Sequence, residues 1–263
     1  MGEEAQFSQI PPYIDRIVDF DDGKSYELLQ PLTTFRHCHD GTPPEARMVF
    51  VCRQRARADV GGTQEYVVKV KIRSAPSPFR DCQADTATAR VPARGGQGDD
   101  SEAQAPEAES STTTRAELKA LKKFRGANTT YAPLLVNYKQ AVQGSSGPLP
   151  GGYMTFTVMT KMPGDSLHNL YFWGMAEDER EEIVQKFLVA LRSIYTLGIE
   201  PVDCALRNVL WERETKRCTI IDFELWRETD GSIDDETKEL QRWGLARKPT
   251  AKNWWEAWNT QWR

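Results

Sequence analysis

Residues 198–210 of the chain read GIEPVDCALRNVL, and after a short polar turn residues 220–224 read IIDFE. The apolar residues on either side of that turn predict a loop followed by a β-hairpin. Such an arrangement can bring the carboxylates of Asp203 and Asp222 and the amide of Asn208 to one point. Oxygen ligands of this kind suit Mg²⁺, which binds one or two carboxylates together with phosphate oxygens and water. The two stretches therefore predict a magnesium site.

The same residues resemble two motifs of the protein kinase-like fold, especially of its compact members, the aminoglycoside and choline phosphotransferases and the RIO kinases. DCALRN is similar to the catalytic loop D-x-x-x-x-N, and IIDFE is similar to the metal-binding D-F-G, in the D-F-E form of small-molecule kinases. The resemblance implies a divergent, fungal-type kinase in which Asp203 is the base or orients the acceptor hydroxyl. It also implies that Asn208 and Asp222 hold Mg²⁺.

A lysine and a glutamate upstream fit this resemblance. Kinases hold the α and β phosphates of ATP with a Lys on a strand of the N-lobe, and a Glu on a helix orients that Lys. VVKV at 67–70 supplies Lys69, and AELK at 116–119 supplies Glu117. Because side chains alternate along a strand, Lys71 lies on the same face as Lys69 and is the second choice for the role.

A connecting segment follows the last strand of the expected sheet. Residues 157–164 read TVMTKMPG, which indicates the end of a strand, a hinge and a turn. Kinases bind the adenine ring through backbone groups of such a hinge. The resemblance therefore implies adenine binding at Thr160, Lys161 and Met162, and it makes ATP and Mg²⁺ the expected cofactors.

Hydrophobic patterns divide the chain into a sheet-rich part and a helical part. Runs of β-branched and aromatic residues predict strands at 48–52, 65–72, 133–136 and 153–159. Helical spacing predicts one helix among them at 116–124, with cap candidates Thr112, Thr113 and Thr114, and further helices at 179–197, 234–244 and 250–262. We expect an α+β, two-lobed protein kinase-like fold, with a small antiparallel-sheet N-lobe at 1–160 and a reduced helical C-lobe at 161–263.

The segment from about residue 73 to residue 114 differs from the rest in composition. Pro, Gly, Ser, Thr, Ala and Asp dominate it, and Phe79 is its only aromatic residue. Such a stretch buries too little apolar surface to offset about 1 to 2 kcal/mol of backbone entropy per residue. It predicts a disordered insertion within the N-lobe.

The overall composition excludes several classes of protein. A net charge of −4 and a pI of 5.6 argue against a uniformly basic nucleic-acid-binding protein. No apolar run approaches the roughly 20 residues that cross a bilayer, and the N-terminal stretch does not resemble a signal peptide. Five cysteines without a C-x-x-C pair indicate neither a disulfide framework nor a four-thiolate zinc site. We expect a cytoplasmic protein with no membrane partner.

Three features depart from the kinase pattern. Residues 33–44 contain one glycine, Gly41, so no glycine-rich loop is evident before the lysine strand. Pro201 stands where kinases usually have a His, two residues before the catalytic Asp. Only 41 residues follow Asp222, without an A-P-E segment. We therefore expect a small-molecule acceptor, or another chain that completes the site, in preference to a protein acceptor bound through an ordinary activation segment.

Three functions remain open from the sequence. The first is transfer of the γ-phosphoryl group of ATP to a hydroxyl of a small molecule. The second is a pseudokinase that acts as a binding module, for which Trp254, Trp258 and Trp262 in the expected last helix offer a face for a protein partner. The third is a kinase fold repurposed for non-phosphoryl transfer, such as the aminoacyl-tRNA-dependent cyclodipeptide formation of small fungal biosynthetic proteins. A tRNA is the one nucleic-acid partner that this third function would require.

Overall fold

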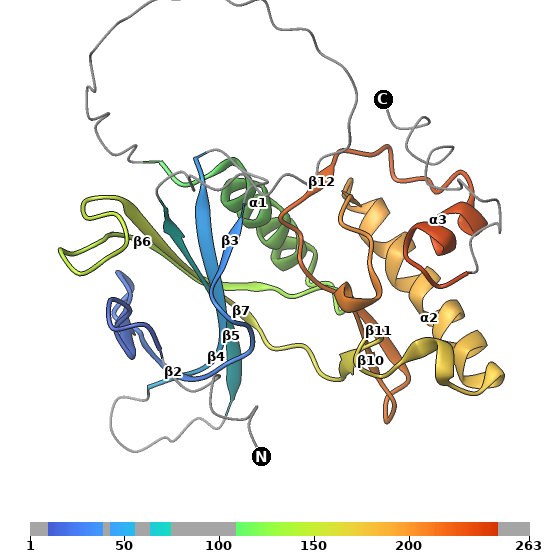
Figure 1. Ribbon diagram of the computed structural model, residues 1–263. Coiled ribbons are helices and arrows are strands. Elements are labelled where there is room, and N and C mark those ends of the chain that lie inside the picture. The colour runs from blue at the N-terminus through green and yellow to red at the C-terminus, as the bar shows by residue number, and fades with distance from the viewer. Residues whose placement is uncertain (1–9, 39–42, 56–63, 75–108, 247–263) are drawn as a thin grey trace, which may run out of the picture.

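The computed structural model describes residues 10–38, 43–55, 64–74 and 109–246 of the 263-residue chain. A curled antiparallel sheet forms one side of the molecule and a mainly helical part forms the other (Figure 1). Helix α1 (Thr112–Ala127) lies between them. The described part thus has the α+β architecture and the sheet-containing N-terminal half that the sequence predicts.

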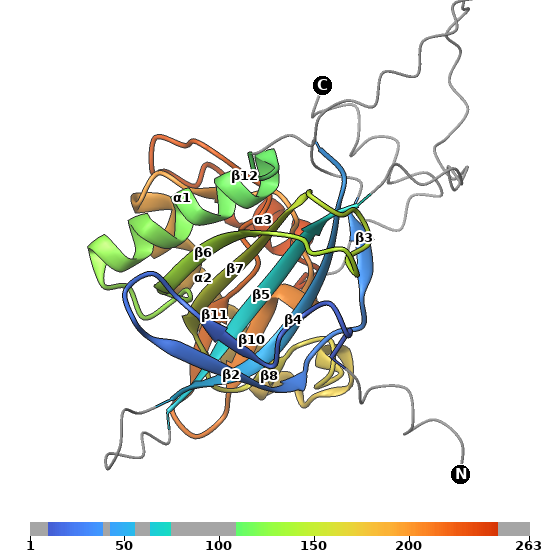
Figure 2. The same ribbon diagram turned by 90° about the vertical axis from the view of Figure 1, so that its left-hand side faces the viewer.

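The sheet has seven strands, in the order β1-β2-β4-β5-β7-β6, with β3 paired to β4. All of its neighbouring pairs are antiparallel. Figure 2 shows the strands face-on, with α1 lying next to β6. The strands are β1 (Ile17–Asp19), β2 (Ser25–Pro31), β3 (Arg36–Cys38), β4 (Glu45–Gln54), β5 (Glu65–Arg73), β6 (Leu135–Val142) and β7 (Tyr153–Thr160).

Strand β5 positions the lysines. It pairs with β4 on one side and with β7 on the other, so its backbone hydrogen bonds are made within the sheet. Its alternate residues Val68, Val70 and Ile72 are fully buried in a core on one face. Because neighbouring side chains point to opposite faces, Lys69 and Lys71 both point to the other face, where α1 lies.

Helix α1 begins with a different cap from the one that the sequence suggested. Ser111 is the N-cap, and its hydroxyl accepts a hydrogen bond from the backbone N–H of Thr114 at 3.1 Å. The prediction that a threonine at 112–114 caps the helix is wrong, because all three form its first turn. The helix ends at Asn128, which adopts a left-handed conformation with φ 48° and bonds back to the last turn.

The predicted insertion at 73–114 is too long at both ends. Arg73 belongs to β5 and pairs with Glu45, and Ser74 donates its N–H to the carbonyl of Pro44 at 3.1 Å. At the other end, Ser111 is fully buried and α1 starts directly after it. Ladder pairing and capping satisfy these backbone groups, and composition cannot reveal either. Residues 75–108 lie outside the described residues.

The C-terminal part contains the elements that the hydrophobic patterns predicted. Helix α2 (Glu177–Thr196) and helix α3 (Glu236–Arg242) lie where helices were expected. Strands β10 (Val209–Glu212) and β11 (Arg217–Ile220) form the expected hairpin. The shorter elements are β8 (Asp165–Ser166), η1 (Phe172–Gly174), β9 (Glu200–Pro201), η2 (Leu206–Asn208) and β12 (Trp226–Arg227). The helix expected at 250–262 lies outside the described residues.

The edge strand β6 differs from its prediction. The sequence indicated a strand at 133–136, whereas β6 runs from Leu135 to Val142. It is the last strand in the order, so only one side is paired, and it tolerates polar residues such as Lys139 and Gln140. An apolar pattern therefore underestimated its length.

The described residues form two hydrophobic clusters. One lies against one face of the curled sheet and includes Phe50, Val70 and Phe156. The other contains most of the helical part, and Leu121 and Phe124 of α1 belong to it. Helix α1 therefore packs with the C-terminal elements although it precedes β6 and β7 in the chain. Among the described residues, no helix is both long enough and apolar enough to span a membrane.

Candidate active site

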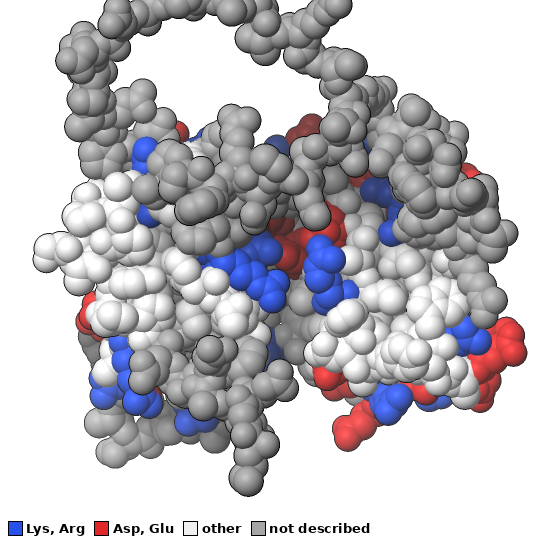
Figure 3. Space-filling model, in the orientation of Figure 1, with Lys and Arg blue, Asp and Glu red and all other residues white. Residues whose placement is uncertain are grey.

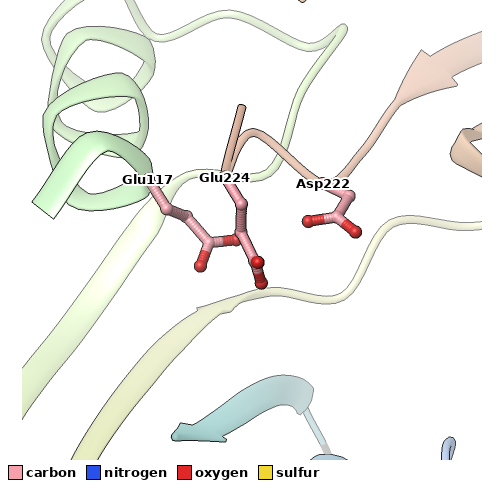
Figure 4. A group of neighbouring side chains, drawn as sticks. All are labelled: Glu117, Asp222 and Glu224. Carbon is pink, nitrogen blue, oxygen red and sulfur yellow. The ribbon is translucent and has the colours of Figure 1, made fainter. Parts of the chain in front are cut away.

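Lys69 is the centre of a buried ionic cluster. Its Nζ donates to Oε1 of Glu117 at 2.6 Å, to Oε1 of Glu224 at 2.8 Å and to Oδ1 of Asp222 at 3.0 Å. The three carboxylates come from α1 and from the segment that follows β11, and they lie side by side (Figure 4). The structure therefore brings together Lys69, Glu117 and Asp222, which the sequence had singled out in three separate regions.

The segment after β11 is held in place from two sides. The N–H of Ile221 donates to the carbonyl of Asn208 at 2.9 Å, which joins this segment to the loop that follows Asp203. The ring of Phe223 is buried and packs edge-to-face against Phe124 of α1, with 4.5 Å between centroids. Between them Asp222 has φ 65°, a left-handed conformation that is uncommon outside glycine. This local geometry turns the carboxylate of Asp222 toward Lys69.

The electrostatics favour the charged forms of Lys69 and Glu224, whereas burial raises the pKa of Glu117. Burial alone would lower the pKa of Lys69, but the charges of Asp222, Glu117 and Glu224 raise it well above its usual value. Burial alone would also raise the pKa of Glu224, yet Lys69, Lys71 and Arg47 together lower it. The ammonium and the carboxylate therefore stabilise each other in their ionised forms.

The cluster contains residues to which the sequence analysis gave no role. Glu224 is the last residue of IIDFE, and Arg47 of β4 lies with its Nη1 2.6 Å from Glu224 Oε2. Glu45 accepts hydrogen bonds from the hydroxyls of Ser111 and Tyr153 at 2.6 and 2.8 Å. The motif could have indicated Glu224. Glu45 and Arg47 gave no signal, because they enter the cluster through strand register, which the sequence does not show.

Lys71, the second-choice lysine, also lies in this cluster. Its Nζ is 3.3 Å from a Glu224 oxygen, 3.8 Å from a Glu45 oxygen and 3.9 Å from a Glu117 oxygen. It makes no hydrogen bond to the described residues, and 2% of its side chain is exposed. Lys71 therefore supplies charge to the interior of the cluster, whereas Lys69 makes the direct hydrogen bonds to its carboxylates.

Asp203 and Asn208 form a second, adjacent group. Nδ2 of Asn208 donates to the carbonyl of Asp203 at 2.9 Å and to its Oδ2 at 3.1 Å. Nη2 of Arg207 donates to both oxygens of the Asp203 carboxylate, at 2.6 and 2.7 Å. About a third of the Asp203 side chain is exposed. The loop thus holds one partly exposed carboxylate in a fixed direction beside the segment that carries Asp222.

The three hinge residues have other contacts. The N–H of Thr160 donates to the carbonyl of Leu134 at 3.0 Å, and its hydroxyl accepts from the N–H of Leu134 at 2.9 Å. The Lys161 ammonium pairs with Glu65 at 2.7 Å on the surface, and the Met162 sulfur contacts the Thr160 hydroxyl at 3.5 Å. These side chains do not point into the ionic cluster, so any contact to an adenine ring would come from the backbone after Thr160.

The donor set of the cluster fits a nucleotide with its metal ion better than a metal ion alone. Ligand atoms of Glu117, Asp222 and Glu224 lie within 4.8 Å of one another, but the Lys69 ammonium is bonded to all three. Asp222 is the most accessible of these carboxylates, with 22% of its side chain exposed against 3% for Glu117. A cation would therefore bind at the Asp222 edge. The three donors of the ammonium are all used, so another anion would bind it only in exchange for one of these carboxylates.

The molecular surface agrees with this arrangement. Lys and Arg side chains lie on both sides of an acidic patch in the hollow between the sheet and the helical part (Figure 3). The cluster contains the three cations Arg47, Lys69 and Lys71 and the four carboxylates Glu45, Glu117, Asp222 and Glu224. Opposite charges are thus concentrated where the two parts of the molecule meet.

Comparison with solved structures finds 855 similar chains. One is a viral kinase. It is the PK-1 kinase of the Cydia pomonella granulovirus, with 17% sequence identity and a TM-score of 0.43. The match covers 80% of this chain and 55% of the viral kinase, so the chain spans about half the length of that protein. A likeness at this level says nothing about what the chain binds. No protein-family model matches the sequence, and no curated protein is similar to it.

Proposed function

We propose that this protein is an ATP-dependent phosphotransferase that moves the γ-phosphoryl group to a hydroxyl of a small molecule. The observation that supports the proposal is the contact of Lys69 with both Glu117 and Asp222, which lie 48 and 153 residues away in the chain. Burying charges is costly unless they are paired, and an enzyme that binds a metal-bound polyanion needs both signs of charge at one place.

Each group then has a role in binding. Lys69 binds phosphate oxygens of the nucleotide, and Glu117 holds the ammonium in position, as their 2.6 Å contact allows. Asp222 and Asn208, whose segments are joined by a backbone hydrogen bond, hold Mg²⁺. When bound, Mg²⁺ neutralises charge on the phosphates. The backbone around Thr160, Lys161 and Met162 lies at the end of β7 and binds the adenine ring.

Asp203 orients the acceptor. Its carboxylate accepts a hydrogen bond from the acceptor hydroxyl, in addition to those from Arg207 and Asn208. The hydroxyl oxygen forms a bond to the γ-phosphorus while the bond from that phosphorus to the bridging oxygen of ADP breaks. The hydroxyl proton passes to the Asp203 carboxylate. The protein contributes mainly by positioning the reactants and neutralising charge.

A small acceptor agrees with the described C-terminal part. Between Phe223 and Ala246 the structure contains β12 and α3, and α3 has seven residues. Within these described residues, there is no long helical platform of the kind with which protein kinases bind peptides. The proposal is therefore for a metabolite that carries a hydroxyl group.

The first test is nucleotide binding. ATP with Mg²⁺ should stabilise the folded protein by RT ln(1 + [L]/Kd), about 2.7 kcal/mol at a concentration 100 times Kd. Chemical denaturation with and without ATP, and with ATP after removal of Mg²⁺ by EDTA, measures this stabilisation. The Lys69→Met variant should not be stabilised by ATP with Mg²⁺. No stabilisation of the unmodified protein would reject the phosphotransferase and would favour the pseudokinase that the sequence left open.

The second test concerns turnover. Asp203→Asn should lower phosphoryl transfer by 10²-fold or more while nucleotide affinity stays within twofold, because Asp203 contacts the acceptor and not the nucleotide. Transfer from labelled ATP to a fractionated metabolite extract provides the assay, and Asp21→Asn on the exposed turn after β1 is the matched control. Equal turnover in Asp203→Asn and in the control would exclude this role for Asp203.

A further inference from the structure

Arg47 occupies a particular place in the ionic cluster. It lies on β4 directly opposite Lys71 of β5 on one side and Arg36 of β3 on the other. Residues directly opposite each other in antiparallel strands share one face of the sheet. Arg36, Arg47 and Lys71 therefore form a basic row across three strands, on the face that also carries Lys69.

The row concentrates like charge on one face of the sheet. Like charges directly opposite each other on neighbouring strands destabilise a sheet, and here there are three in succession. The interior end of the row is balanced, since Lys71 and Arg47 are within 3.3 and 2.6 Å of Glu224 oxygens. The outer end faces solvent, because Arg36 is exposed and 27% of the Arg47 side chain is accessible.

The Glu224 carboxylate shows how an anion fits between the cations. Its Oε1 is 2.8 Å from the Lys69 ammonium, and its Oε2 is 2.6 Å from the Arg47 guanidinium. One anion with two oxygens thus bridges Lys69 and Arg47. A phosphate group also presents two or more oxygens, and a guanidinium binds them in a forked geometry. Arg47 and Asp222 are the accessible members of the cluster, so an incoming polyphosphate meets them first.

We propose that Arg47 binds the terminal phosphates of the nucleotide, in exchange for Glu224, with Arg36 extending the site toward solvent. This inference rests on the proposed function. It also accounts for a departure in the sequence, where residues 33–44 contain only Gly41 and no glycine-rich loop. A side chain on β4 then supplies the phosphate contacts that the backbone of such a loop supplies in other kinases.

The test compares ligands that differ only in their phosphates. Affinities of adenosine, ADP and ATP are measured by competition with a fluorescent ATP analogue, for the unmodified chain and for Arg47→Gln. We expect Arg47→Gln to lower the affinity for ATP at least tenfold and the affinity for ADP by a smaller factor. The affinity for adenosine should change by less than twofold. Arg36→Gln should lower the three affinities in the same order, by smaller factors than Arg47→Gln.

Two further variants keep the result interpretable. Arg47→Lys retains a cation beside Glu224 and should recover part of the ATP affinity, which a variant that merely misfolds would not. Arg16→Gln, which removes an exposed partner of Glu27 on β2, is the matched control and should bind all three ligands normally. Equal losses for adenosine and ATP, or no loss for ATP, would overturn the role of Arg47. Failure of the unmodified chain to bind ATP or adenosine would instead overturn the proposed function, and the inference with it.

Discussion

The ammonium of Lys69 is almost completely enclosed, with 7% of its side chain exposed, and each of its three hydrogen bonds ends on a carboxylate. A buried ion pair adds little net stability compared with apolar residues, but removing one partner leaves a charge without compensation. The cluster is therefore sensitive to single changes, and the partners are energetically coupled.

We predict that Lys69→Met lowers the free energy of unfolding by about 3 kcal/mol, because Glu117 loses its closest cation. Glu117→Gln added to Lys69→Met should restore part of this loss, since the uncompensated charge is gone. Urea denaturation of the two single variants and the double variant gives the coupling free energy. Strictly additive losses would show that the two side chains do not interact.

Arg207 and Asp203 show a different balance. Their contact is an i,i+4 pair in which 58% of the Arg207 side chain is exposed, so it contributes little to stability. Its effect is on direction, because the guanidinium holds both carboxylate oxygens. The ion pairs of Lys69 thus affect the stability of the fold, whereas the ion pair of Asp203 mainly orients its carboxylate.

At the scale of elements, helix α1 carries Glu117 and is fixed at several points. Its N-cap Ser111 also donates to Glu45 Oε2 of β4 at 2.6 Å. Next to Glu117, the indole N–H of Trp226 in β12 donates to the carbonyl of Ala116 at 2.9 Å. Lys119 and Lys123 of the helix both lie over the Trp226 ring. These contacts hold Glu117 where it meets Lys69.

We predict that Ser111→Ala destabilises the protein by about 1 to 2 kcal/mol, through loss of the N-cap and of the bond to Glu45. Thr112→Ala, one residue later and exposed, is the matched control and should cost less than about 0.5 kcal/mol. Thermal and urea unfolding of both variants measure the difference. A larger effect at Thr112 would return the cap to the threonine that the sequence suggested.

Strands β9 and β12 hold the residues before Asp203. Glu200 of β9 accepts hydrogen bonds from Arg227 of β12 and from Arg242 of α3, whose Nη1 donates to it at 3.0 Å. Nη2 of Arg242 also donates to the carbonyl of Pro201 at 3.0 Å. These contacts support the loop at the position where the expected His is replaced by Pro201.

The Glu200 contacts predict a dependence of stability on pH. Burial would raise the pKa of Glu200, but hydrogen bonds and charges from Arg227 and Arg242 lower it below its usual value of 4.5. The stabilisation is therefore present above pH 4.5 and is lost as pH falls through the lowered pKa. In urea denaturation, the stability difference between the unmodified chain and Glu200→Gln should be constant near neutrality and shrink below pH 4.5. A difference that persists unchanged at pH 3 would contradict this assignment.

At the scale of the whole molecule, the ionic cluster joins two hydrophobic cores. Lys69 extends from the strand whose other face packs in the sheet core, and Asp222 and Glu224 adjoin the core that contains α1 and α2. Apolar packing between the two parts involves a small number of sheet residues, such as Leu135 of β6 and Met159 of β7, which belong to the second core. Contacts between buried charges couple the unfolding of the two parts.

We predict that the double variant Asp222→Asn with Glu224→Gln unfolds in two steps. All eight tryptophans follow residue 160, so their fluorescence reports on the C-terminal part, whereas far-ultraviolet circular dichroism reports on both parts. The two probes should give the same urea midpoint for the unmodified chain and different midpoints for the variant. Coincident midpoints in the variant would mean that apolar contacts alone couple the cores.

Local patterns located the lysine strand β5, its neighbours β4 and β7 and the helices, but they missed β1, β2 and β3. They also singled out Lys69, Glu117, Asp203, Asn208 and Asp222 as candidate site residues. Strand alternation placed Lys69 and Lys71 on one face, and helical spacing located α2 and α3, because both depend on neighbours in the chain. The adenine contacts suggested at Thr160, Lys161 and Met162 remain a prediction.

The membership of the ionic cluster depended on contacts between distant segments. Arg47 lies opposite Lys71 only because β4 and β5 pair in one register, and a shift of one residue would turn Arg47 to the other face. Ser111 replaces the threonines as the cap because Glu45, 66 residues earlier, accepts its hydroxyl. Charge balance inside a protein is set by which segments are packed together, and this packing is a property of the folded chain and not of any short stretch of its sequence.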